Sequence, residues 1–191
     1  VKDRMVVAVE AIEGTDAAHK LTILGSIAYG MDFQFDNVYT EGIVAITPQD
    51  IRFAQELGYR IKHLGIARRT ADGVELRVHP TLLPERQMLA SVNGVMNAVM
   101  VEGDAVGSTL YYGAGAGSEP TGSAVVADLV DLARLPENSG CMIPVTANAT
   151  SAPKIVSMDQ VETGYYLRMH AMDRPGVLAD VTRILGESEI S

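Results

Sequence analysis

Apolar residues recur at helical spacing between residues 16 and 29. The positions that share one face of this predicted helix are Ala17, Ala18, Leu21, Leu24 and Ala28. Thr15 or Asp16 is expected to cap the start of the helix, and Gly30 stands where it should end. The pattern therefore predicts one amphipathic helix packed on a core.

Further along, the pattern alternates between short helices and strands. Pro48 opens a second helix that should stop at Gly58, a typical residue just after a helix end. An Asp72-Gly73 pair predicts a hairpin between its flanking strands. The expected strands are Arg60–Arg69, Val74–His79, Asn97–Glu102 and Ser108–Tyr112, and a third helix covers Thr121–Leu135. These elements predict an α/β (α+β) fold, a mixed sheet with helices packed on it.

Three local features modify this picture. The apolar run Val6–Ile12 is left unplaced, because it fits either the end of a helix or a piece of another domain. His79 precedes Pro80, which favours extended geometry and should set the end of its strand. Asn93 and Asn97 lie among small residues and are expected to serve close packing.

The C-terminal part has a different character. Residues 136–162 read as a linker, since the stretch to Pro153 is rich in Asn, Ser, Thr, Ala and Pro and has no periodicity. Tyr165–Met172 alternates as a strand, and Asp173-Arg174-Pro175-Gly176 opens an amphipathic helix. Residues 163–191 therefore predict a strand, a turn and a helix.

Composition narrows the class of protein. A net charge of −9 and a pI of about 4.8 argue against a nucleic-acid partner or a membrane surface, which usually require clustered basic residues. No apolar run approaches the roughly 20 residues of a membrane span, and the N-terminus does not read as a signal peptide. Cys141 is the single cysteine, so neither an intrachain disulfide nor a metal site is expected. A cytoplasmic setting is expected.

Two segments carry candidate chemistry. Asp16 and Lys20 stand one helical turn apart and must share a face, although surface pairs of this kind are common and contribute only about 0.2–0.5 kcal/mol. Gly113, Gly115 and Gly117 lie between a predicted strand and a helix, as in a dinucleotide-binding turn. The G-x-G-x-x-G pattern fails because Ser118 replaces its last glycine, and the motif alone favours a simple tight turn that leads into a helix.

Five blocks of sequence, which occur in a fixed order along the chain, include these two segments. They are the Glu13-Gly14-Thr15-Asp16-Ala17-Ala18-His19-Lys20-Leu21 run, Val38–Ile43, His79–Pro84, Asn93–Val99, and Tyr112–Gly117 with Pro120–Asp128. From about residue 13 onward the chain resembles the homoserine dehydrogenase family. The resemblance implies a reversible conversion of L-homoserine and L-aspartate 4-semialdehyde that uses NADP or NAD.

The resemblance also implies roles for single residues. Lys20 matches the lysine to which the family assigns proton transfer, and Asp16 matches a substrate-binding carboxylate. Gly117 matches a cofactor contact in the loop that approaches the nicotinamide cofactor. His19 points off this face and is expected to be structural. The family's substrate-binding glutamate has no counterpart, because ungapped counting puts Met5 in its place.

The resemblance suggests a division of the chain. Residues 1–12 are unplaced, with a remnant of the nucleotide-binding domain as one interpretation. Residues 13–135 correspond to the catalytic, substrate and dimerisation domain, including the 113–117 loop, and residues 163–191 resemble the start of an ACT domain. Such a domain implies an amino-acid effector such as threonine, and the family implies a homodimer or homotetramer. The alternative is a non-catalytic fragment that acts as a dimerisation or amino-acid-binding module, because most of the nucleotide-binding domain is absent from this sequence.

Overall fold

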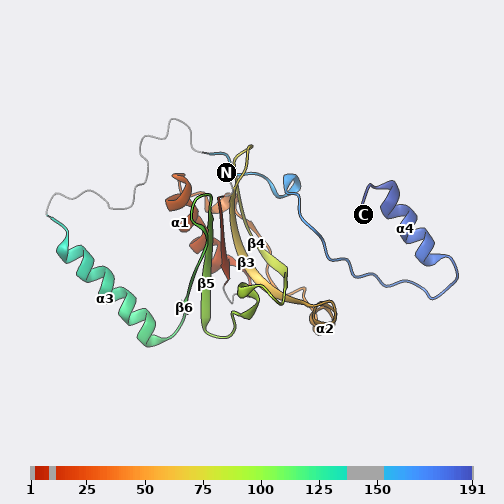
Figure 1. Cartoon of the computed structure of the whole chain (residues 1–191), viewed down its shortest axis with the longest axis horizontal. Helices are drawn as coiled ribbons and strands as arrows, with labels where there is room; N and C mark the ends of the chain where they lie inside the picture. Colours follow the sequence, from red (N-terminus) through yellow and green to blue (C-terminus); the bar gives the residue numbers. More distant parts are fainter. Residues whose placement is uncertain (1–2, 9–11, 137–152, 191) are drawn as a thin grey trace.

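A single mixed sheet organises the protein. The computed structural model describes residues 3–8, 12–136 and 153–190. Six strands form the sheet in the order β2-β4-β3-β1-β5-β6 (Figure 1). All neighbouring strands are antiparallel except β2 and β4, which run parallel. The predicted fold class is confirmed.

The elements fall close to the predicted ranges. The strands are β1 (Arg4–Ala8), β2 (Tyr39–Thr40), β3 (Tyr59–Arg69), β4 (Val74–Pro84), β5 (Met96–Gly103) and β6 (Gly107–Ala114). The α-helices are α1 (Thr15–Tyr29), α2 (Pro48–Glu56), α3 (Ser118–Arg134) and α4 (Val177–Glu187). The short 3₁₀ helices are η1 (Phe35–Asn37), η2 (Met88–Ser91) and η3 (Met158–Gln160).

The strand that the sequence left unplaced lies inside the sheet. β1 pairs with β3 on one side and with β5 on the other, so that Val6 lies opposite both Ile66 and Met100. Met5 and Val7 belong to the hydrophobic cluster under α1, whereas Val6 belongs to the cluster on the opposite face. Because both faces are covered, the strand reads as a continuous apolar run without alternation. The interpretation of this region as a helix end is wrong for residues 4–8.

Helix α1 packs closely on the middle of the sheet. Leu21 is fully buried over Gly65, and a Cβ built on Gly65 would lie 3.4 Å from the Leu21 side chain. The expected cap at Thr15 or Asp16 is wrong: the N-cap is Gly14, with φ of +85° and no side-chain hydrogen bond. Gly14 approaches Thr40 of β2 and His63 of β3 so closely that a larger residue would not fit at this start. The helix ends at Gly30 as predicted.

The hairpin between β3 and β4 forms at Asp72-Gly73 as predicted, but β4 is longer than expected. His79 does not end the strand, which continues through Pro80 to Pro84. β2 covers β4 only at Arg77 and Val78, so the outer edge of β4 is open at Pro80. A missing N–H costs no ladder hydrogen bond at an open edge.

Helix α2 begins and ends as the local sequence predicts. Thr47 and Asp50 form a reciprocal capping box, in which the Thr47 N–H donates to Asp50 Oδ2 at 2.8 Å. Pro48 occupies the first turn. Gly58 follows the helix with φ of +77°.

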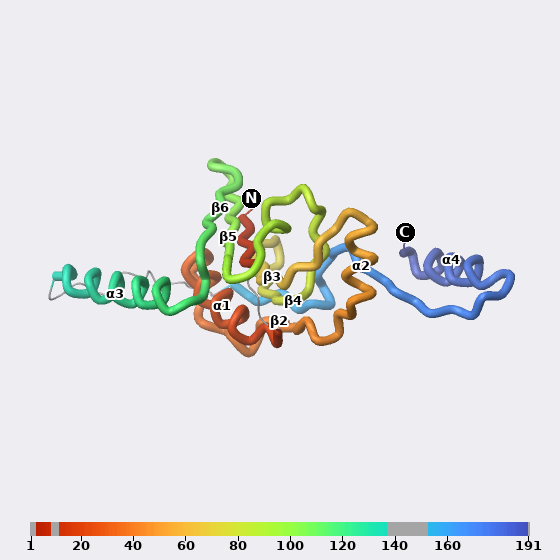
Figure 2. The backbone as a smooth tube through the Cα atoms, turned by 90° about the horizontal axis from the view of Figure 1, so that it is seen from below, coloured from red at the N-terminus to blue at the C-terminus, as the bar shows by residue number. Residues whose placement is uncertain are grey.

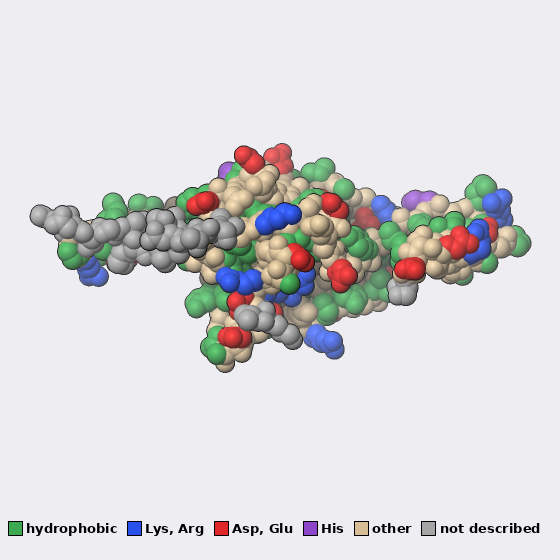
Figure 3. Space-filling model, turned by 90° about the horizontal axis from the view of Figure 1, so that it is seen from above, with side chains coloured by type: hydrophobic (Ala, Val, Ile, Leu, Met, Phe, Trp, Pro, Cys, Tyr) green, Lys and Arg blue, Asp and Glu red, His purple; other side chains and the backbone are tan. Residues whose placement is uncertain are grey.

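The last two helices lie away from the sheet. α3 follows β6 and extends to one side, and α4 lies on the other side (Figures 1 and 2). Neither helix contains a buried residue. Figure 3 shows the α4 segment as an arm that carries hydrophobic, acidic and basic side chains. In the described part of the chain, no helix is long and apolar enough to cross a membrane.

The predicted strand at Tyr165–Met172 does not form. These residues have no regular secondary structure, because no described strand pairs with them. The helix predicted after them is present as α4. Part of the predicted linker, residues 137–152, lies outside the described residues, whereas Ile155 bridges to Val74 of β4 in parallel.

The approach of this returning segment makes Gly73 sensitive to substitution. Gly73 has φ of +145°, and an added Cβ would lie 2.1 Å from the backbone oxygen of Lys154. We expect Gly73→Ala to destabilise the chain by about 1–3 kcal/mol, measured by urea unfolding. Gly122→Ala is the matched control, because Gly122 is in α3 with open space around it and should show no loss. Equal stability of the two variants would contradict this expectation.

Candidate active site

The entry into α1 is fixed by close backbone contacts. The Ile43 N–H donates to the Ile12 oxygen at 2.9 Å. A Cβ on Gly42 would lie 2.6 Å from that same oxygen, so only glycine allows the two segments to meet. Gly14 lies equally close to Thr40, whose methyl would be 2.9 Å from an added Cβ. The first turn of α1 is therefore held against the loop that follows β2.

Asp16 and Lys20 lie on the outward face of this fixed helix. Lys20 Nζ donates to Asp16 Oδ2 at 2.7 Å. The two side chains are 65% and 43% exposed, for Asp16 and Lys20 respectively, while Ala17 and Leu21 are buried on the inner face. The predicted shared face is confirmed. The pair presents a carboxylate and an ammonium group to solvent from a rigid support.

His63 of β3 packs against the start of α1. Its side chain is buried, and a Cβ on Gly14 would lie 3.0 Å from His63 Cε1. His63 Nε2 lies 2.8 Å from the Glu41 backbone oxygen. Since a carbonyl can only accept, Nε2 carries the proton and donates. The other ring nitrogen, Nδ1, is buried and has no hydrogen-bond partner in the described structure.

Tyr39 and His79 are two further ionisable residues near Glu41. The Tyr39 hydroxyl donates to Glu41 Oε2 at 3.1 Å, and partial burial together with this hydrogen bond raises the pKa of Tyr39. Burial lowers the pKa of His79, although a hydrogen bond from its ring to the Pro80 oxygen acts in the opposite direction. The carboxylate of Glu41 is exposed, as expected for a loop residue.

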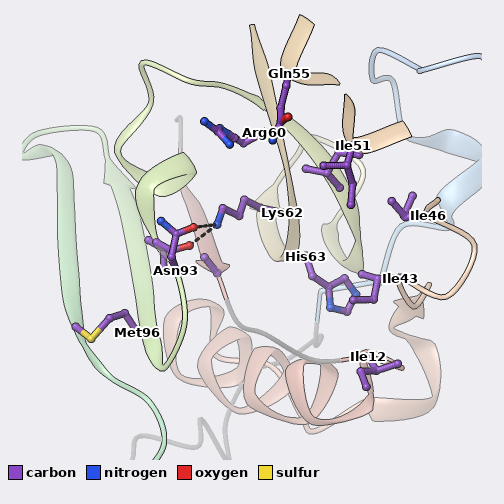
Figure 4. Close-up of a pocket in the computed structure, with 13 residues that line it drawn as sticks. Ile12, Ile43, Ile46, Ile51, Gln55, Arg60, Lys62, His63, Asn93 and Met96 are labelled. Carbon is purple, nitrogen blue, oxygen red and sulfur yellow. Dashed lines mark hydrogen bonds between the residues drawn. The ribbon is translucent and has the colours of Figure 1, made fainter. Parts of the chain in front are cut away.

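A hollow of about 640 Å³ opens next to the α1 entry (Figure 4). Its apolar lining includes Ile12, Ile43, Ile46, Ile51, Ile61, Val92 and Met96. Lys62 also lines the hollow and points toward Asn93, and its Nζ donates to Asn93 Oδ1 at 2.8 Å and to the Val92 oxygen. Neither Asp16 nor Lys20 lines this hollow.

The sequence did not single out these hollow-lining residues. Asn93 was expected to serve close packing, but it is exposed and holds Lys62 instead. Lys62 and His63 stand together between the apolar residues Ile61 and Leu64 of β3, and this polar pair was a signal for them. Their partners at positions 93 and 41 come from distant loops, which the local pattern could not indicate.

Gly117 belongs to a different element from the charged pair, which lies in α1. It is the N-cap of α3 with φ of +116° and ψ of 153°, a conformation that essentially only glycine adopts. No described hydrogen bond or ion pair joins it to α1. The predicted site residues therefore form one pair, Asp16 with Lys20, and a separate loop.

Gly117 has open space beside it at the start of α3. An added Cβ at Gly117 would meet only Pro120, at 3.4 Å, so the loop surface is open. A helix N-terminus with open backbone fits the approach of a phosphate group. The described residues contain no group of three or more His, Cys, Asp or Glu placed to hold a metal ion.

The chain is similar in sequence to proteins of one known family. The homoserine dehydrogenase family model matches residues 9–130. A homoserine dehydrogenase of Pseudomonas aeruginosa is 60% identical over 184 residues, which cover 94% of this chain and 42% of that protein. The corresponding protein of Neisseria gonorrhoeae is 50% identical with the same coverage.

Solved structures agree with the sequence matches. A homoserine dehydrogenase from Thiobacillus denitrificans superimposes with a TM-score of 0.89 at 49% identity, covering 98% of this chain and 52% of that one. The chain thus spans about half the length of its relatives or less. With a family match over most of its length and relatives of this identity, the chain belongs to the homoserine dehydrogenase family.

Proposed function

We propose that this chain supplies the substrate half of a homoserine dehydrogenase, which interconverts L-homoserine and L-aspartate 4-semialdehyde with a nicotinamide cofactor. The observation that carries the proposal is the Asp16–Lys20 pair, with 2.7 Å between the charged groups, on a helix whose entry is fixed by backbone contacts. Residues 13–135 form the catalytic, substrate and dimerisation domain in this proposal. Residues 163–191 begin an ACT domain with an amino-acid effector such as threonine.

Lys20 is assigned the proton transfer. In homoserine oxidation, neutral Lys20 Nζ accepts the proton of the substrate hydroxyl as the carbon loses hydride. In the reverse direction the ammonium returns this proton to the forming alkoxide and stabilises its charge. The cofactor, when bound, supplies the hydride acceptor or donor.

Asp16 is assigned the binding of the substrate's polar groups. Its carboxylate already accepts from Lys20, and its remaining lone pairs can accept from a substrate ammonium or hydroxyl. The two residues would therefore act together on one ligand. A substrate that reaches Lys20 also meets Asp16, because they lie one helical turn apart.

Gly117 is assigned the cofactor contact, and the cofactor is NAD or NADP. A homoserine dehydrogenase from a hyperthermophilic archaeon, which shares only the fold at 19% identity, was solved in complex with NADPH. Choice between the two cofactors depends on a residue near the ribose. A homodimer or homotetramer and a cytoplasmic setting complete the proposal.

A chimaera tests the proposed function. Residues 13–135 of this chain replace the matching segment of the Pseudomonas aeruginosa protein, which is 60% identical to the chain. We expect the chimaera to oxidise L-homoserine with NAD or NADP, measured by absorbance at the reduced nicotinamide band. A folded chimaera that binds the cofactor but does not oxidise homoserine would overturn the proposal.

Intact mass tests the alternative of a non-catalytic module. If the protein in its source cells has a mass near 20.4 kDa, the chain acts without a nucleotide-binding half and the alternative is favoured. A mass near twice this value supports the dehydrogenase.

A further inference from the structure

The segment that leads to α4 is attached to the sheet at one point. The Val74 N–H donates to the Lys154 oxygen at 2.9 Å, and the Val156 N–H donates back to the Val74 oxygen at the same distance. Val156 and Val161 are both buried. These contacts fix residues 154–161 beside the start of β4.

The same segment is attached a second time, at the N-terminus of α2. The Tyr166 hydroxyl donates to Asp50 Oδ1 at 2.9 Å, and Arg168 Nε lies 3.0 Å from the same oxygen. Arg168 Nη1 also donates to Gln49 at 3.2 Å. The Asp50 side chain is only 5% exposed, so this is a buried anchor made by residues more than 110 positions apart.

Asp50 connects this anchor to the cap of α2. Its other oxygen, Oδ2, accepts from the Thr47 N–H and hydroxyl. The Thr47 hydrogen bonds, assisted by Tyr166 and Arg168, lower the pKa of Asp50 to about 2. The carboxylate is therefore ionised at neutral pH and serves both attachments at once.

Helix α2 in turn forms part of the wall of the hollow. Ile51 and Gln55 line it, and Ile51 directly follows Asp50. Residues after Arg168 make no described hydrogen bond or ion pair to the sheet or to α2. Every described hydrogen bond and ion pair of residues 169–190 stays within the α4 segment itself.

We propose that residues 154–168 form a strap that stabilises α2 and, through it, the wall of the hollow. Asp50 is the coupling residue, because it holds Tyr166 and Arg168 with one oxygen and the α2 cap with the other. The strap rests on contacts within this chain and is independent of the dehydrogenase proposal.

Hydrogen–deuterium exchange of the 191-residue chain tests the coupling. The variants are Tyr166→Phe, Arg168→Gln and the double substitution, none of which alters α2 itself. We expect amide exchange to accelerate roughly fivefold to tenfold in α2, since hydrogen bonds to the charged group at its N-terminus are lost. Arg183→Gln is the matched control, because it breaks an exposed arginine–glutamate pair within α4 and should leave exchange in α2 unchanged.

Exchange in α2 decides the result. Unchanged exchange in α2 in the double variant would show an attachment without coupling and would overturn the proposal. Tyr166→Phe removes only one hydroxyl from a half-buried ring, so this variant remains informative if the double variant does not fold.

Discussion

Replacing Lys20 with alanine is expected to lower the homoserine turnover of the chimaera by about 10²–10⁴-fold, the usual contribution of a general acid or base. The reason is that Lys20→Ala removes the only nitrogen assigned to proton transfer. The Lys20 side chain is 43% exposed and paired only with Asp16, so the melting temperature should change little. Steady-state kinetics and thermal unfolding measure the two quantities.

Two further variants separate proton transfer from charge. Lys20→Arg keeps the positive charge, but its guanidinium does not release a proton near neutral pH, so turnover should remain low. Asp16→Asn should raise KM more than it lowers kcat, because Asp16 is assigned to binding. Turnover of Lys20→Ala within a few-fold of the parent chimaera would remove Lys20 from the mechanism.

Replacing Leu21, the residue next to Lys20, is expected to lower the stability of the chain. Leu21 is fully buried between α1 and the sheet, so Leu21→Ala should destabilise the 191-residue chain by about 2–5 kcal/mol. The loss combines the transfer free energy of the removed atoms with the cavity over Gly65. Denaturant unfolding followed by circular dichroism measures it.

Ile23 provides the control for this substitution. It lies on the same helix but is 47% exposed, so Ile23→Ala should cost less than about 1 kcal/mol. Similar losses for Leu21→Ala and Ile23→Ala would mean that α1 does not pack on the sheet as described. Together, the Lys20 and Leu21 variants test the outer and inner faces of one helix.

Elements whose signals are local were predicted well. The start of α2 depends on Thr47, Pro48 and Asp50, which lie within four residues of one another. The turn at Asp72-Gly73 depends on two residues, and the extent of α1 depends on a repeated apolar stripe. In each case the chemistry that fixes the element lies within the element itself.

Elements that depend on distant partners were predicted poorly. Residues 4–8 become a strand only because β3 and β5 supply partners on both sides. Tyr165–Met172 alternates like a strand, yet it has no described partner and does not become one. Pro80 stays within β4 because the neighbouring edge is open, which no local rule could indicate.

The sequence by itself determined the presence of the helices, the hairpin at Asp72-Gly73, the family resemblance and the shared face of Asp16 and Lys20, because these follow from spacing and short-range chemistry. Only the tertiary structure decided the position of β1, the glycine start of α1, the support of that start by His63, and the Asp50 anchor. Each of these requires groups far apart in the chain to meet at hydrogen-bond or van der Waals distance. Such meetings are fixed by the packing of the whole sheet.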